Sequence, residues 1–264
     1  MDKNLIYVAE PTDCCQQAAE QPQVAVKHGS RKALQIWLSV AVYCVLIPLL
    51  IFVGVKLLQD RKYNVVSVAI AFLACVPFFV GFERGKTGAR ELVVIAVMTA
   101  ISVVGRLIFA PIPGFKPVTA IVIITAIAYG PQAGFVTGAL SAIVSNIFYG
   151  QGPWTPFQMF VWGILGFIVG LISKRGSKPS AVYLIIVGLV GGVAYSMMMD
   201  VWTVLSVAGE WDWSRYLAAI STSLPFMAIY AVSNVVFLLL LTKPFLDKLN
   251  RIGIKYGLFG QGQQ

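Results

Sequence analysis

The sequence predicts an all-α membrane protein. Hydrophobic residues make up 58% of the 264-residue chain and charged residues only 12%, and the mean hydropathy is +0.81. Soluble domains carry about 25% charged residues, so this composition excludes an ordinary soluble domain. The apolar residues form continuous runs, whereas the strands of a membrane β-barrel alternate apolar and polar residues. Such runs are typical of transmembrane helices.

Eight helices are expected from these apolar runs and from the polar or turn-forming residues between them. Their ranges are 34–58, 64–82, 91–109, 117–129, 131–149, 156–173, 182–207 and 216–242. The first run is longer than the core of a cleavable signal peptide, so we expect it to be a membrane span.

The range 117–129 is unusually short, because a helix needs about 20 residues to cross a hydrocarbon core. Tyr129-Gly130-Pro131 then turns the chain directly into the next helix. Irregular backbone at membrane depth must be buried in protein or line a cavity. We therefore expect a hollow that opens to the outer side. The loops expected to cover it are 110–116, 150–155 and 208–215.

Basic residues are distributed unevenly between the loops. Most of the 20 lysines and arginines fall on the side of the two chain ends if the predicted helices alternate across the membrane. By the positive-inside rule, both termini are expected in the cytoplasm, which gives eight spans. The net charge of +9 then reflects topology and contact with anionic membrane lipid, and it does not indicate nucleic-acid binding.

The segment 149–158 contains two glycines, two prolines, two glutamines and a tryptophan between two apolar runs. Its second half matches a helix start. Thr155 is the expected N-cap, Pro156 the first helical residue, and Gln158 the capping-box partner. Gln158 therefore has a structural explanation, and binding of a ligand is the alternative.

Helix initiation does not explain Gln151 and Trp154, so these residues are expected to form one wall of a pocket at the outer face. Trp162 lies two turns into its helix, deeper than a residue of an interfacial belt, and could stack on a flat ligand. Asn146 and Asn234 could simply bridge helices. Asn146 is the stronger site candidate, because it precedes the loop by one turn.

Asp200 is the only carboxylate well inside a predicted span. An acid at the bilayer centre costs about 2.5–3.5 kcal/mol, so it usually faces a cavity or a partner. Arg106, near the outer end of its helix, is the candidate ion-pair partner. Three interpretations are open: a ligand contact, a structural Asp–Arg bridge, and capping of Asp200 by Tyr195 and Trp202.

Small residues form two stripes at helical spacing. One stripe consists of Gly130, Gly134, Gly138 and Ala142. Such stripes allow close approach of a neighbouring helix, and packing within the bundle is the expected role. The other stripe consists of Ala96 and Ala100. Internal packing is again the default, and docking of a partner protein is the alternative.

Several catalytic motifs are missing from the sequence. It has no Walker A motif, no His-Glu-x-x-His zinc motif and no Gly-x-Ser-x-Gly nucleophile elbow. The only histidine, His28, lies in the polar N-terminal segment, which excludes histidine-based catalysis or metal binding in the membrane. An ion-coupled carrier is expected to show internal repeats and several membrane-embedded ionisable groups, and we see neither.

Three segments resemble the substrate-binding S components of energy-coupling factor (ECF) vitamin transporters. The first is Ala96-x-x-x-Ala100. The second is Lys116-Pro117-Val118-Thr119, followed by Tyr129-Gly130-Pro131-Gln132-Ala133-Gly134. The third runs from Gly150 to Met159 and looks most like the cobalamin-type members.

The resemblance implies a six-helix S-component core with two additional transmembrane helices before it. The chain then divides into a flexible cytoplasmic tail (1–33), the additional pair (34–88), the core (89–245) and a cytoplasmic C-terminal tail (246–264). The resemblance also implies docking of Ala96 and Ala100 on a transmembrane T component, which works with two ATPase subunits.

The expected function is capture of a vitamin, cobalamin first, at the outer face of a bacterial or archaeal cell membrane. The residues expected to bind it are Arg106, Asn146, Gln151, Trp154, Gln158, Trp162, Asp200 and Trp202. Amide side chains and a tryptophan suit a large, amide-rich corrinoid. No enzymatic activity, resident cofactor or metal is expected. The alternatives are an S component for a different vitamin, an ion-coupled carrier that uses Asp200, and a membrane scaffold without transport function.

Overall fold

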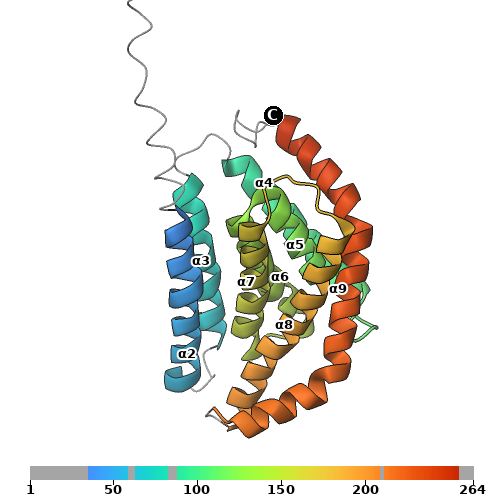
Figure 1. The fold of residues 1–264 in the computed structure, drawn as a ribbon. Helices are drawn as coiled ribbons and strands as arrows, with labels where there is room; N and C mark the ends of the chain where they lie inside the picture. Colours follow the sequence, from blue (N-terminus) through green and yellow to red (C-terminus); the bar gives the residue numbers. More distant parts are fainter. Residues whose placement is uncertain (1–34, 59–62, 83–87, 209–210, 256–264) are drawn as a thin grey trace, which may run out of the picture.

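The computed structural model describes residues 35–58, 63–82, 88–208 and 211–255, and all regular structure in these ranges is helical (Figure 1). The elements are η1 (Ala41–Leu46, a π-helical segment), α2 (Ile47–Leu58), α3 (Tyr63–Phe82), α4 (Gly88–Ile108), α5 (Val118–Tyr129), α6 (Pro131–Tyr149), α7 (Trp154–Ile172), α8 (Ala181–Ala208) and α9 (Trp213–Lys255). Since η1 lies within one continuous helix, Gln35–Lys56, the described residues form the eight helices expected from the sequence.

Five of the described helices are long and apolar enough to cross a membrane. They are Gln35–Lys56, Glu91–Ile108, Trp154–Ile172, Ala181–Val207 and Trp213–Lys255. Large apolar side chains such as Trp37, Phe72 and Leu240 are exposed on the surface. An apolar surface of this extent requires lipid around it. The prediction of an all-helical membrane protein is confirmed.

Helix α5 lies inside the bundle, and every one of its residues is buried. It packs against α4, α6, α7 and α9. At its end Gly130 has φ +96°, a conformation that favours glycine, and Pro131 then begins α6. The helix that is too short to cross the bilayer is therefore enclosed by protein, as its length predicted.

Helices α6 and α7 approach each other closely through glycine. A Cβ atom on Gly138 would lie 2.5 Å from the carbonyl oxygen of Trp162. A Cβ on Gly134 would lie 2.8 Å from the carbonyl oxygen of Gly166. The expected packing role of this stripe is confirmed for these two residues. The close approach brings the polar side chains at the end of α6 and at the start of α7 within hydrogen-bonding distance of one another.

The α2–α3 hairpin packs on α6 and α7 (Figure 1). Tyr43, in η1, donates a hydrogen bond from its hydroxyl to the carbonyl oxygen of Ala74 at 2.9 Å. Its ring stacks on Phe135 of α6 with centroids 3.7 Å apart. Gln132 donates to the hydroxyl of Ser39 at 3.0 Å. The stacking of Tyr43 on Phe135 and the hydrogen bond from Gln132 to Ser39 thus join the hairpin to α6.

Helix α9 is longer than expected. The sequence predicted an end at 242 and a tail from 246, but the helix continues to Lys255. Pro225 lies inside it, where a proline removes one helical hydrogen bond and favours a bend. Figure 1 shows the first turns of α9 lying across the end of the bundle before the helix runs alongside α8.

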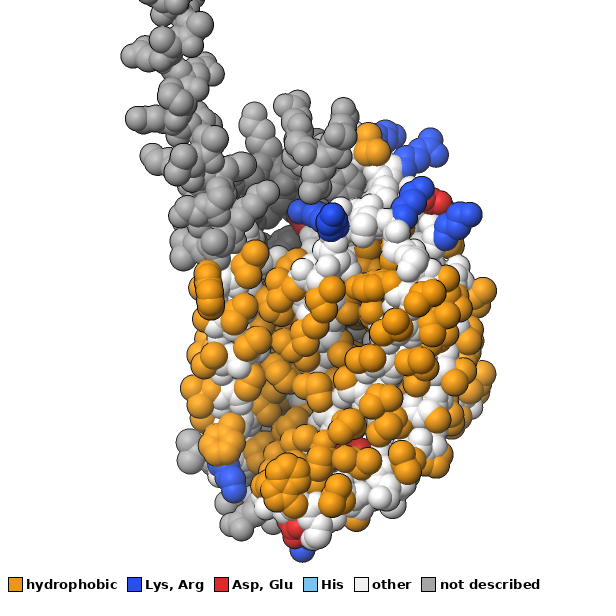
Figure 2. Space-filling model, in the orientation of Figure 1, with side chains coloured by type: hydrophobic (Ala, Val, Ile, Leu, Met, Phe, Trp, Pro, Cys, Tyr) orange, Lys and Arg blue, Asp and Glu red, His pale blue; other side chains and the backbone are white. Residues whose placement is uncertain are grey.

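Lysine and arginine side chains gather at the end of the bundle where α9 finishes (Figure 2). We call this the basic end. Between the basic end and the opposite end, the visible flank of the molecule is covered by apolar side chains.

Candidate substrate-binding site

A polar cavity lies beside the start of α5, in the half of the bundle away from the basic end. The residues that line it come from α4, the following loop, α5, α7, α8 and α9. They are Arg106, Lys116, Val118, Thr119, Gln158, Trp162, Tyr195, Tyr230 and Asn234. Its volume of about 60 Å³ has room for a few water molecules. A hollow was expected at this helix because the helix is short.

A chain of hydrogen bonds joins three helices beside the cavity. Arg106 of α4 donates to the side-chain oxygen of Asn146 at 2.8 Å and also to the hydroxyl of Ser145. The Asn146 amide nitrogen donates to Gln158 at 2.9 Å and to the hydroxyl of Thr155 at 3.0 Å. Both ends of the Asn146 amide are therefore used. Because buried polar groups without partners are costly, this network holds its members in one arrangement.

The network continues into an aromatic wall. Gln158 donates to the hydroxyl of Tyr195 at 3.0 Å. The Tyr195 ring stacks on Trp162 with centroids 5.4 Å apart and an interplanar angle of 14°, and its edge meets the Tyr230 ring at 5.0 Å. Rings from α7, α8 and α9 are thus in contact with one another, and the Arg106 guanidinium carbon lies 5.1 Å from the centroid of the Trp162 ring.

Two cations, Arg106 and Lys116, lie beside the ring of Tyr149. The Arg106 guanidinium carbon is 4.5 Å from the centroid of the Tyr149 ring, and the Lys116 ammonium is 5.1 Å from the same centroid. The backbone of Lys116 is anchored to α9, because its N–H donates to the hydroxyl of Ser233 at 2.9 Å. Burial, and secondly the Arg106 charge, lower the pKa of Lys116.

None of the residues that line the cavity is a carboxylate. The cavity therefore combines positive charge, amide groups and aromatic rings. Together these features suit a flat ligand with electron-rich oxygen atoms.

A family model described as the S component of an ECF-type riboflavin transporter matches residues 86–250, more than half of the chain. The chain belongs to this family. It is a transport subunit without enzymatic activity, as the missing motifs predicted. No curated protein and no solved structure matches it. The resemblance to S components is confirmed, whereas the cobalamin type is not supported, because the matching family is described for riboflavin.

Four of the expected site residues take part in the cavity or its network in this S component. Arg106, Gln158 and Trp162 line the cavity. Asn146 lies behind them and positions Arg106 and Gln158. These residues were selected for polarity or unusual depth within an apolar helix, and the structure brings them together.

The other four expected residues do not line the cavity. Gln151 donates back to the carbonyl oxygen of Ile143 at 2.8 Å, so it closes the end of α6. Trp154 packs edge-on against Trp202 with centroids 5.9 Å apart. Asp200 accepts a hydrogen bond from Ser223 of α9 at 2.6 Å. Gln151 and Trp154 thus lie outside this cavity, and the outer wall expected from them stays a prediction.

The expected Arg106–Asp200 ion pair is absent from the described residues, because each side chain has another partner. Arg106 binds the polar end of α6, whereas Asp200 faces α9. The expected capping of Asp200 by Tyr195 and Trp202 is also not found among the described residues: Asp200 accepts from Ser223, and the buried Trp202 indole N–H has no hydrogen-bond partner there. Apolar helices gave no periodic signal to show which side of α8 faces inward.

The predicted capping box at the start of α7 is wrong as well. The helix begins at Trp154, with Pro153 as its N-cap and no side-chain cap. Thr155 and Gln158 instead accept hydrogen bonds from the same Asn146 amide. Residues that looked like a helix start thus bind the neighbouring helix.

Sequence reasoning missed several residues that line the cavity. Lys116 and Thr119 lie in a segment already noted for its family resemblance, although no role was assigned to them. Asn234 was considered a weaker candidate than Asn146, and Tyr230 was not considered. Asn234 and Tyr230 could have been found because each is a polar side chain in an otherwise apolar helix.

The stripe of Ala96 and Ala100 lies on the exposed surface of α4. Val97 and Val104, on the same helix, are also exposed. The default expectation of packing within this chain is therefore wrong for this stripe, and its surface is open to a partner.

Proposed function

We propose that this S component captures a riboflavin-type vitamin at the outer face of a bacterial or archaeal cell membrane. It then delivers the vitamin through a T component and two ATPase subunits. The observation that carries this proposal is the aromatic wall of Trp162, Tyr195 and Tyr230, which lines one cavity together with amides and cations. The family match supports the same vitamin type.

Each part of the cavity suits one part of a flavin. The fused ring system can stack on the aromatic wall. Its carbonyl groups can accept hydrogen bonds from Arg106, Lys116 or the amide of Gln158. Thr119 and Asn234 are then available to form hydrogen bonds with the hydroxyl groups of the riboflavin side chain. The division into an apolar stacking surface and a few polar groups is typical of small-molecule sites.

The cavity must enlarge before a vitamin enters. Its volume of about 60 Å³ is well below the roughly 300–1,000 Å³ of ligand pockets. Helix α9 is the element that could move, because Pro225 weakens it.

Cobalamin is the less favoured ligand. A corrinoid is larger than a flavin, and the cavity would have to enlarge further to hold it. The cobalamin hypothesis also depended on Gln151 and Trp154, which do not line the cavity.

The proposed orientation has eight spans and both termini in the cytoplasm. The basic end then contacts the cytoplasm and its anionic lipids, in agreement with the positive-inside rule. The cavity, in the other half of the bundle, opens toward the outer side. The exposed Ala96 and Ala100 are proposed to dock on the T component, since small residues allow close helix contact.

Ligand titration of the purified full-length protein tests the function. Riboflavin fluorescence should be quenched on binding, and riboflavin should bind about 100-fold more tightly than cobalamin. Equal or tighter binding of cobalamin would overturn the assignment of the vitamin. Vitamin uptake by this chain alone in proteoliposomes, sensitive to a protonophore, would instead support the ion-coupled carrier.

A further inference from the structure

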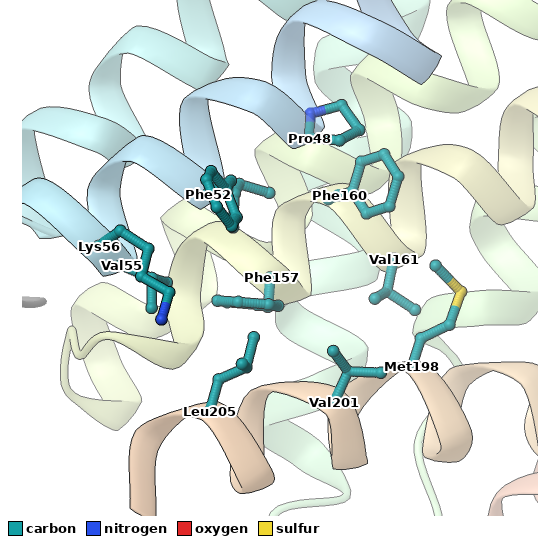
Figure 3. Close-up of a pocket in the computed structure, with 11 residues that line it drawn as sticks. Pro48, Phe52, Val55, Lys56, Phe157, Phe160, Val161, Met198, Val201 and Leu205 are labelled. Carbon is teal, nitrogen blue, oxygen red and sulfur yellow. The ribbon is translucent and has the colours of Figure 1, made fainter. Parts of the chain in front are cut away.

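A second, apolar cavity lies between the α2–α3 hairpin and the core (Figure 3). We call it the hairpin groove. Helix α7 forms its floor, and α2 and α8 form its walls. It is lined by Pro48, Ile51, Phe52, Val55, Lys56, Phe157, Phe160, Val161, Met198, Val201 and Leu205. Its volume is about 230 Å³.

The lining of the hairpin groove does not suit a polar vitamin such as a flavin. Lys56 is the one polar residue among the 11 that line it. Specific binding of a polar metabolite requires several placed donors and acceptors, which this groove lacks. Aliphatic and aromatic side chains on three helices instead suit a long hydrocarbon chain.

The length of the hairpin groove matches one leaflet of a bilayer. Pro48 and Lys56 are eight residues apart on α2, which corresponds to about 12 Å along the helix axis. Half of a hydrocarbon core is about 15 Å. Figure 3 shows Lys56 and Leu205 at one end of the groove and Met198 at the other. Since α2 runs away from the basic end, Lys56 lies toward the opposite surface.

We propose that the hairpin groove holds one acyl chain of a phospholipid from the leaflet opposite the basic end, with the lipid phosphate beside Lys56. The ammonium group lies at the end of the groove where a headgroup at the membrane surface would lie. Lysine and phosphate form charge-assisted hydrogen bonds. The bound lipid would then fill the gap between the hairpin and α8.

The hairpin groove adjoins the polar cavity through α7. Phe157 and Val161 line the groove, and the next residue after each, Gln158 and Trp162, lines the cavity. On α8, Met198 faces the groove one turn after Tyr195, which lines the cavity. An acyl chain in the groove would therefore brace the two helices that carry the aromatic wall.

Native mass spectrometry of the full-length protein with added phosphatidylglycerol tests this proposal. The wild type should retain one phospholipid at collision energies that remove the others. Val201→Trp fills the groove and should reduce the retained fraction about tenfold. Val190→Trp is the matched control, because Val190 is exposed on the same helix outside the groove, and it should retain the lipid. Equal retention by wild type and Val201→Trp, or equal loss in both variants, would overturn the site.

Two further measurements test the phosphate contact of Lys56 and the position of the acyl chain in the wild-type protein. Lys56→Gln should weaken retention of phosphatidylglycerol several-fold but not that of diacylglycerol, which has no phosphate. Equal effects on both lipids would contradict the phosphate contact. A phosphatidylglycerol with a photoreactive acyl chain should label α7 and the groove side of α8 in the wild-type protein. Labelling spread evenly over exposed α8 residues would contradict an acyl-chain site without requiring any variant to fold.

Discussion

Arg106 of α4 and Gln158 of α7 are joined through one amide, that of Asn146. The guanidinium donates to the Asn146 oxygen at 2.8 Å, and the Asn146 nitrogen donates to Gln158 at 2.9 Å. Asn146 is fully buried, so both bonds lie away from the surface of the protein. A residue outside the cavity thus sets the position of two residues that line it.

Asn146→Leu should weaken riboflavin binding at least tenfold and lower the thermal stability. Leucine has a similar size but cannot bind either partner, and an unpaired buried polar group costs about 1–3 kcal/mol. Flavin fluorescence titration and thermal unfolding measure the two effects. Asn250→Leu is the control, because Asn250 bonds the carbonyl oxygen of Gly176 instead. Unchanged affinity in Asn146→Leu would show that the network does not position the site.

Trp162→Leu should weaken riboflavin binding about two- to tenfold, since a favourable aromatic pair contributes about 0.5–1.5 kcal/mol. Trp162→Phe should restore part of the affinity, because it keeps a ring beside Tyr195. Trp213→Leu provides the control, as Trp213 is exposed. If the Trp162→Phe variant binds riboflavin no more tightly than the Trp162→Leu variant, Trp162 does not contribute to binding by stacking.

The stability of the ligand-free protein should rise with pH as the pH passes the lowered pKa of Lys116. Burial and Arg106 lower this pKa, so between the folded pKa and the ordinary value of about 10.4 the unfolded state binds more protons than the folded state. Stability therefore increases with pH in that window. Lys116→Gln should lose this part of the increase in melting temperature between pH 7 and 10. Identical pH profiles of variant and wild type would argue against a buried charge at Lys116.

Gly138→Val should separate α6 from α7 and reduce both stability and vitamin affinity. The added Cβ would lie 2.5 Å from backbone of Trp162, which cannot move aside as a flexible side chain can. Overpacking of this kind costs about 1–3 kcal/mol. Gly191→Ala is a suitable control, because its nearest neighbour would be at 3.7 Å, an ordinary contact. Thermal unfolding compares the variants, and a Gly138→Val protein as stable as Gly191→Ala would contradict the close approach.

Ala96→Trp and Ala100→Trp should abolish vitamin uptake in the complete transporter and leave riboflavin binding unchanged. Both side chains are exposed, so the larger residue does not disturb the core but obstructs a close helix contact. Uptake and binding are measured on the same variants. Ile147→Trp, on an exposed position of α6, should support normal uptake. Lost binding in the alanine variants would place these residues in the fold instead of in a docking surface.

The sequence predicted the helices well and the orientation of their faces poorly. Long apolar runs and the segment Tyr129–Pro131 were sufficient to predict eight helices, one of them short and enclosed. The boundary of α9 was missed, because amphipathic residues after 242 continue a helix that packs on the core. Arg106 was the candidate ion-pair partner of Asp200, but Asp200 accepts a hydrogen bond from Ser223.

By itself, the sequence determined the fold class, the short central helix, the glycine packing stripe and the relation to S components. The first three follow from composition, run length and local backbone chemistry, which are properties of neighbouring residues, and the relation to S components rests on the resemblance of three segments. Only the tertiary structure decided that Asn146 joins Arg106 to Gln158 and that Lys116, Tyr230 and Asn234 line the same cavity. A helix in lipid is apolar on every side, so periodicity does not reveal which residues face inward. That information arises only when the helices pack and each buried polar group must find a partner.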